Sequence, residues 1–153
     1  MKIASVTAKL ITICFLAFAC TTAFAGGNEI NIDVNEWSLK INKSKIKAGS
    51  ISFDVLNSGK ETHELAIIRL DNKMMADVGK LPVNKHGGID EDNMNFGEVV
   101  GEIEDIVSGN KASKHFKLAP GRYAVVCNIQ ETEPDGSVEA HYSMGMRALL
   151  EVE

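Results

Sequence analysis

Apolar and polar side chains alternate along most of this chain, and this period of two constrains the fold more than any other feature. In "EINIDVN", Ile30, Ile32 and Val34 fall on one face of an extended segment. The same spacing recurs in four further runs: Trp37, Leu39 and Ile41; Ile51, Phe53 and Val55; Tyr123, Val125, Cys127 and Ile129; Met146, Ala148, Leu150 and Val152. Short alternating segments separated by Gly, Asn and Pro are typical of half-buried strands. The sequence therefore predicts an all-β protein, a Greek-key antiparallel β-sandwich.

The middle of the chain breaks this alternation. Residues 71–97 are polar and contain glycine, and they show no clear period. Within them "NKMMADVGK" predicts about two helical turns and "NKHGGIDEDNMN" a loop. Strand-like runs resume at "GEIEDI" and at "KHFKL", where Phe116 and Leu118 point inward. We predict a central excursion of loop and short helix on the surface of the sandwich, a kind of segment that is sometimes functional.

The N-terminal segment has the pattern of a secretory signal peptide. Lys2 and Lys9 precede an apolar run, and "AFA" at residues 23–25 supplies a small-x-small cleavage pattern. We predict cleavage after Ala25, which makes residues 1–25 the signal peptide and 26–153 a single domain in the periplasm or outside the cell. Lipoprotein anchoring at Cys20 is the weaker alternative, because bulky Phe18 fits its pattern poorly. We expect no membrane anchor.

The charge of the mature chain limits its partners. Without the two lysines of the signal peptide, 14 basic and 21 acidic residues remain, a net charge of −7. This balance argues against nucleic acid or an anionic membrane surface as a partner. An acidic surface favours encounter with a basic protein.

Cys127 is the one cysteine that remains after cleavage, so it has no partner for an internal disulfide. A free thiol is prone to oxidation in an exported protein. One interpretation is a buried, inert cysteine. The other is a metal ligand, because His141 and Met146 follow it and precede the last predicted strand. A hairpin would return both residues to the strand end that carries Cys127.

A second histidine must come from another part of the chain for such a site. His115 faces solvent by alternation, and His86 lies in the irregular segment. His63 lies between the turn "NSGKE" and the apolar run "ELAIIRL", at a strand end where a site can be built on rigid elements. Two imidazoles, a thiolate and a weak thioether suit copper in a one-electron role. The residues alone leave the thioether open between Met144 and Met146, which have the same parity.

Three motifs in this order resemble the cupredoxins, the small blue (type 1) copper proteins. They are "NSGKETHE", "LAPGRYAVVCNI" and "HYSMGM", and the similarity is greatest to the plastocyanin-like and sulfocyanin-like branch. The resemblance runs from about Ile30 to Val152, outside the central excursion. It implies a cupredoxin-like fold and one type 1 copper ion that cycles between Cu(I) and Cu(II). The ligands it implies are His63, Cys127, His141 and, as the fifth residue after that histidine, Met146.

One departure from the family pattern concerns the loop between Cys127 and His141. The family usually crosses this interval in a few residues, whereas here 13 intervene, with Glu131, Glu133 and Glu139 among them. Loop length itself costs little free energy, so we expect metal binding to survive. The acidic loop would steer a basic redox partner, such as a c-type cytochrome or a terminal oxidase, or it is a solvated loop without a partner.

Three functions are consistent with these residues. We predict an electron carrier and no enzyme, because multicopper oxidases and copper nitrite reductases place a histidine beside this cysteine, where Val126 and Asn128 stand here. The alternative is a copper carrier or scavenger with extra thioethers. Those thioethers would come from Met74, Met75, Met94 and Met144. The third is a binding module without metal, for which the full ligand set would have no purpose. We expect a monomer.

Overall fold

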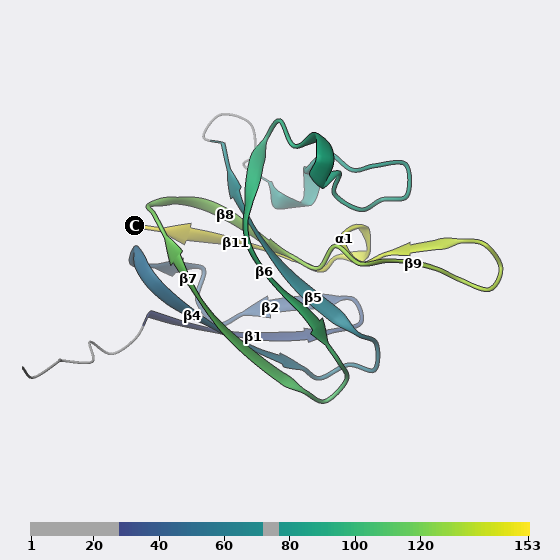
Figure 1. Ribbon diagram of the computed structural model, residues 1–153, viewed down its shortest axis with the longest axis horizontal. Coiled ribbons are helices and arrows are strands. Elements are labelled where there is room, and N and C mark those ends of the chain that lie inside the picture. The colour runs from purple at the N-terminus through teal and green to yellow at the C-terminus, as the bar shows by residue number, and fades with distance from the viewer. Residues whose placement is uncertain (1–27, 72–76) are drawn as a thin grey trace, which may run out of the picture.

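The computed structural model describes residues 28–71 and 77–153 of the chain. The predicted signal peptide and Met74 and Met75 lie outside these residues. Two β-sheets face each other across one core (Figure 1). The first sheet has the strand order β2 (Ser38–Ile41), β1 (Asn28–Asn35), β4 (Gly49–Asn57) and β7 (Lys111–Leu118). The second has the order β3 (Lys45–Ile46), β11 (Arg147–Val152), β8 (Gly121–Val126), β5 (His63–Leu70) and β6 (Gly97–Ile106).

The predicted β-sandwich is confirmed, and its sheets are mixed rather than purely antiparallel. β1 pairs with β4 in parallel, with Ile30 opposite Phe53, and β3 pairs with β11 in parallel. The other strand pairs of the two sheets are antiparallel. Between β1 and β4 the chain makes the β2 hairpin and visits the second sheet at β3, so it returns to the first sheet in its original direction.

The alternating residues form the core between the sheets. The first three residues of the predicted alternation, Ile30, Ile32 and Val34, are at most 2% exposed. Opposite strands contribute Leu65, Ile67, Tyr123, Val125 and Leu150 to the same cluster. Burial of this many aliphatic and aromatic side chains is the main stabilising contribution to a domain of this size. The alternation thus fixes which face of each strand points inward.

The central excursion builds a second, smaller core on the outer face of the second sheet. It contains two 3₁₀ turns, η1 (Val78–Lys80) and η2 (Glu91–Asn93). The predicted helical segment is described only from Asp77 on, where it forms the single turn η1. Leu81, Ile89 and Phe96 are buried there against β5 and β8. Both faces of these two strands are therefore covered, which explains why "LAIIRL" and "YAVV" are apolar at nearly every position.

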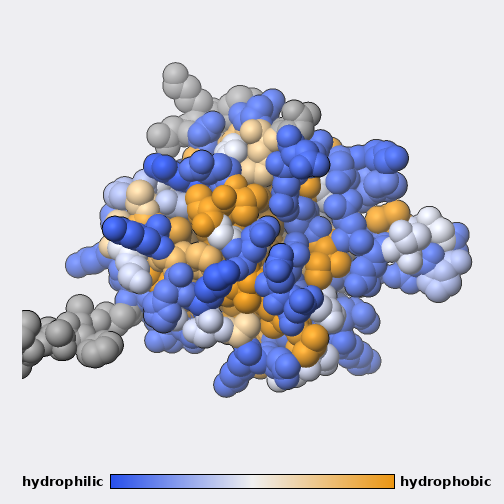
Figure 2. All heavy atoms as spheres, in the orientation of Figure 1, coloured by the Kyte–Doolittle hydropathy of each residue, from blue (hydrophilic) through white to orange (hydrophobic). Residues whose placement is uncertain are grey.

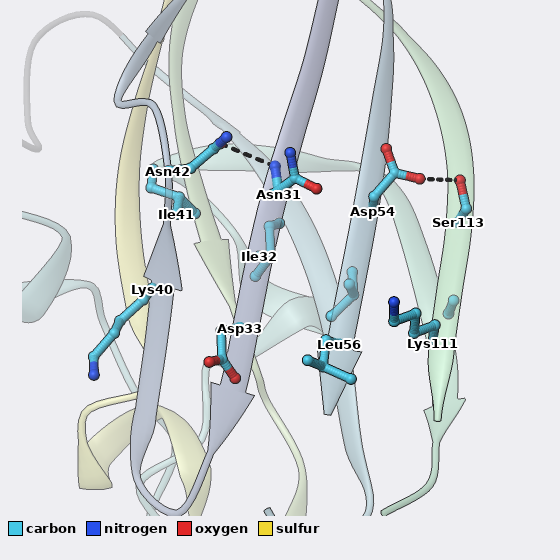
Figure 3. Close-up of a pocket in the computed structure, with 12 residues that line it drawn as sticks. Asn31, Ile32, Asp33, Lys40, Ile41, Asn42, Asp54, Leu56, Lys111 and Ser113 are labelled. Atoms are coloured by element: carbon cyan, nitrogen blue, oxygen red, sulfur yellow. Dashed lines mark hydrogen bonds between the residues drawn. The ribbon is translucent and has the colours of Figure 1, made fainter. Parts of the chain in front are cut away.

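The outer face of the first sheet is hollowed into a groove away from the strand ends that carry the predicted ligands. Figure 3 shows Asp33, Lys40, Asp54 and Lys111 along it, and the hydroxyl of Ser113 donates to Asp54 at 2.6 Å. No histidine or cysteine lines this groove. In the described part of the chain, no helix has the length and hydrophobicity needed to cross a membrane.

Candidate metal centre

The four predicted ligands lie where strands end. His63 is the first residue of β5, and Cys127 follows directly after β8. His141 opens the short helix α1 (His141–Met144), and Met146 directly precedes β11. All four side chains are 0% exposed. The predicted residues are therefore held at the ends of rigid strands and inside the protein.

Asn57 shapes the turn that delivers His63. Its side-chain amide donates to the carbonyl oxygens of Glu61 at 2.8 Å and Ile106 at 2.7 Å. Its Oδ1 accepts the backbone N–H of Gly59 at 2.9 Å. Asn57 is completely buried, so each of these bonds replaces a hydrogen bond to water that burial would otherwise remove. The turn between β4 and β5 is thus fixed from inside.

A tight turn holds His141 and Met146 together. The backbone N–H of Met146 donates to the carbonyl of His141 at 3.1 Å, and Gly145 ends α1 with a φ of 128°. Glycine adopts such positive φ values without the steric cost that a side chain would add. The N–H of Cys127 donates to the carbonyl of Met146 at 3.0 Å, which ties this turn to the cysteine.

Three donor atoms converge in the buried interior. The Sγ of Cys127 lies 3.2 Å from Nδ1 of His141 and 3.9 Å from Nδ1 of His63, and the two Nδ1 atoms are 3.2 Å apart. Donor atoms this close together can bind one ion, because metal–imidazole bonds are about 2.0–2.1 Å long and metal–thiolate bonds about 2.3 Å. Among the described residues, this is the one group of three or more His, Cys, Asp or Glu side chains with such close donor atoms.

Glu64 links the two strands that carry His63 and Cys127. Its backbone N–H donates to the Sγ of Cys127 at 3.4 Å. Its side-chain Oε1 accepts the backbone N–H of Asn128 at 3.0 Å. An N–H directed at sulfur stabilises the thiolate form, which is the form that binds metals. Glu64 is the last residue of the motif "NSGKETHE", but the sequence analysis gave it no role.

Burial shifts the pKa of each of the three donors in the direction that favours its neutral form. It raises the pKa of the Cys127 thiol to about 11, although hydrogen bonds from the backbone oppose this shift. Burial also lowers the pKa of His141 to about 4, with the neighbouring His63 as a second cause, and it lowers the pKa of His63. At neutral pH both imidazoles therefore carry lone pairs, and a metal has only the thiol proton to displace.

The turn between β1 and β2 contributes one residue beside each of the two histidines. Glu36 Oε1 lies 3.6 Å from Nε2 of His63, and the ring of Trp37 lies 5.0 Å from the ring of His141. Sequence analysis placed Trp37 only in an alternating strand and did not select Glu36. No local pattern marks either residue as part of a site, because the contact depends on two turns that are distant in sequence.

The remaining candidates lie apart from this group. His86 and His115 are exposed and contribute no donor to it. Met144 is 45% exposed, whereas Met146 is buried in the same core cluster as Cys127. Met94 is half-buried against the second core. Burial therefore distinguishes the two methionines that the sequence alone left open.

No family model matches the sequence, and no curated protein sequence matches it. Solved structures match by shape. Reduced auracyanin from the photosynthetic bacterium Roseiflexus castenholzii is 19% identical, with 83% of this chain and 98% of that chain covered and a TM-score of 0.51. Rusticyanin from Thiobacillus ferrooxidans is 16% identical over 84% of this chain and 79% of that chain, with a TM-score of 0.51. At these identities the likeness establishes the fold, and it confirms the cupredoxin-like sandwich that the motifs led us to expect.

Proposed function

We propose that this protein is a one-electron carrier with a single type 1 copper ion. The observation that carries the proposal is the convergence of Nδ1 of His63, Sγ of Cys127 and Nδ1 of His141 in a buried site. Two imidazoles and one thiolate form the ligand set of blue-copper electron-transfer sites. The fold supports it, because one structure of similar shape is that of the copper protein rusticyanin, with a TM-score of 0.50.

Met146 would supply the fourth, weakly binding ligand in this proposal. It is completely buried beside the cysteine in the same cluster, whereas Met144 faces solvent. A thioether is soft and favours Cu(I), whereas imidazole serves both oxidation states. Copper, when bound, would supply the Cu(II)/Cu(I) couple. The chain would supply a fixed ligand geometry, water exclusion and a protected thiolate, which together keep the reorganisation between oxidation states small.

The surface beside the site suits a basic redox protein, such as a c-type cytochrome or a terminal oxidase. The acidic hairpin of β9 (Gln130–Thr132) and β10 (Val138–Ala140) projects from this end of the sandwich (Figure 1). The negative charge of Glu131 acts to raise the pKa of His63, against the larger lowering by burial. Long-range attraction between opposite charges raises association rates. We further propose that residues 1–25 direct export and that the mature protein acts in the periplasm or outside the cell.

The decisive experiment is a Cu(II) titration of the purified metal-free protein, followed by visible absorption. We expect an intense charge-transfer band that saturates at one copper per chain and is absent from Cys127→Ser. His86→Gln is the matched control, since it removes an exposed histidine, and it should behave like the wild type. A protein that binds copper without this band, or equally well without Cys127, would refute the electron-carrier proposal.

Two further comparisons complete this test. Met146→Leu should change the band position and the reduction potential, whereas Met144→Leu should change neither. Competition with a Cu(I) chelator distinguishes the copper carrier that the sequence left open. An electron carrier retains its ion through repeated oxidation and reduction, whereas a carrier of copper releases it to the chelator.

A further inference from the structure

The carboxylate of Glu36 lies near the ring nitrogen of His63 that points away from Cys127. The Oε1 of Glu36 lies 3.6 Å from Nε2 of His63. This Nε2 is buried and has no hydrogen-bond partner. Nδ1, the other ring nitrogen, faces the cysteine sulfur and His141. His63 therefore stands between a carboxylate and the proposed metal position.

The carboxylate of Glu36 is held in place by the turn that precedes His63. Its Oε1 accepts the backbone N–H groups of Lys60 at 2.6 Å and Glu61 at 2.8 Å. A Cβ atom at Gly59 would overlap this carboxylate, so a side chain at that position would displace Glu36 from where it lies now. The Glu36 side chain is 27% exposed. Two backbone donors thus hold an anion next to a completely buried imidazole, and the absence of a side chain at Gly59 leaves room for it.

We propose, on the basis of the proposed copper site, that Glu36 is a positioning residue that orients His63 and favours the oxidised ion. An approach of about 0.5 Å would bring Nε2 and Oε1 within the usual hydrogen-bond range of about 2.7–3.2 Å. A proton on Nε2 leaves the Nδ1 lone pair free for the metal. A carboxylate behind a ligand histidine also raises the basicity of that ligand, and loss of such a partner typically costs about 10–100-fold in metal affinity.

The added negative charge should act more strongly on Cu(II) than on Cu(I). Glu36→Gln is the appropriate variant, because glutamine keeps an oxygen that accepts from Lys60 and Glu61 and loses only the charge. We expect Cu(II) affinity to fall about tenfold relative to Cu(I) affinity, which raises the reduction potential by about 59 mV for one electron. Glu61→Gln is the matched control, since Glu61 is an exposed neighbour in the same turn. Its potential should shift by less than a third of that amount.

A measurement without copper tests the orientation directly. The ¹⁵N chemical shifts of the His63 ring in the metal-free protein report which nitrogen carries the proton. We expect Nε2–H in the wild type and a greater share of Nδ1–H in Glu36→Gln. A wild-type ring protonated mainly on Nδ1 would overturn the proposal, whether or not the protein binds copper.

The outcomes separate this proposal from the proposed function. If the ring carries Nε2–H but no charge-transfer band forms with copper, the electron-carrier proposal fails and the orienting role of Glu36 stands. If the band forms but Glu36→Gln and Glu61→Gln shift the potential equally, only general surface charge acts and the proposal is overturned. It is also overturned if Glu36→Gln lowers stability with no change in potential, because Glu36 would then only fasten the turn.

Discussion

Two segments extend the sandwich near the candidate metal centre, and they are built in opposite ways. The central excursion, residues 77–96, buries Leu81, Ile89 and Phe96 against the second sheet. The acidic hairpin, residues 130–140, has a fully exposed β9, and within β10 only Ala140 is buried. In Figure 2 the projecting hairpin shows mainly white and blue atoms, which belong to residues of intermediate to low hydropathy, and a small orange patch. The excursion is part of the core, whereas the hairpin is a surface feature.

The two segments also differ in how they are attached to the site. Asn128, next to Cys127, accepts the N–H of Ile89 at 2.6 Å and donates to its carbonyl at 3.0 Å. The hydroxyl of Tyr142, next to His141, forms hydrogen bonds with the backbone of Leu81 and Val78 in the excursion. The hairpin is closed by its own bonds, such as Glu133 N–H to the carbonyl of Ser137 at 2.8 Å. Changes in the excursion should therefore disturb the structure of the metal centre more than changes in the hairpin.

The largest expected difference is in stability. Phe96→Ala removes a side chain that is 1% exposed in the second core. We expect a loss of about 3–5 kcal/mol in the free energy of unfolding, because the substitution leaves a cavity. Val138→Ala in the hairpin should cost less than about 1 kcal/mol, since Val138 is only half-buried. Urea denaturation of the metal-free variants measures both, and equal losses would show that the excursion is no more a part of the core than the hairpin.

The response to acid tests whether the hairpin or the buried site controls stability at low pH. Unfolded His141 takes up its proton near pH 6.5, whereas the folded residue does so near pH 4. Between these values the unfolded state binds more protons, so the free energy of unfolding should fall as pH drops from 6.5 towards 4. This one residue accounts for up to about 3 kcal/mol, and His63 adds a change of the same sign.

Denaturation of the metal-free protein at several pH values measures this slope. His141→Gln should flatten it, and the triple variant with Gln at Glu131, Glu133 and Glu139 should keep it. A slope that survives in His141→Gln but disappears in the triple variant would assign the acid sensitivity to the hairpin instead.

The sequence could predict much of the fold and three donor positions, because both depend on local patterns. Alternation determines which residues face inward, and His63 and Cys127 stand at the ends of apolar runs. The parallel pairing of β1 with β4 could not be predicted, since alternation carries no information on strand direction. The roles of Glu36 and Trp37 depend on that pairing, because it brings the β1–β2 turn beside the turn before His63.

The second core also could not be predicted from the residues of the central excursion. Ile89 and Phe96 are isolated apolar residues in a polar segment, so no period marks them as buried. The sequence signal for this core lies instead in β5 and β8, the strands that Ile89 and Phe96 cover. Ala66, Ile68, Ala124 and Val126 lie on the face that alternation would leave to solvent, and all are 0% exposed. Apolar residues on both faces of a strand indicate that something covers each face.

Removal of one hydroxyl tests the attachment of the excursion more finely. The hydroxyl of Tyr142 accepts the N–H of Leu81 at 2.9 Å and donates to the carbonyl of Val78 at 2.7 Å. Tyr142→Phe leaves a buried N–H without its partner, so we expect a loss of about 1–3 kcal/mol. Hydrogen exchange should show faster opening at Leu81, with no change in the hairpin. Unchanged exchange at Leu81 would mean that packing alone holds the excursion.

The smallest expected effect on stability comes from the acids of the hairpin. Burial raises the pKa of Glu139, and repulsion from Glu133 and Glu131 adds to the shift. Conversion of all three to Gln relieves this repulsion, so the free energy of unfolding should change very little. Association with a basic partner should respond much more. Electron transfer to a cationic c-type cytochrome at low salt should slow by about tenfold and lose most of its dependence on ionic strength.

Reaction with an uncharged reductant such as hydroquinone is the control for this rate, and it should be unchanged. Equal rates for wild type and variant with the cytochrome would show that the hairpin is a solvated loop, and the steering role would then have to come from acidic residues elsewhere on the protein.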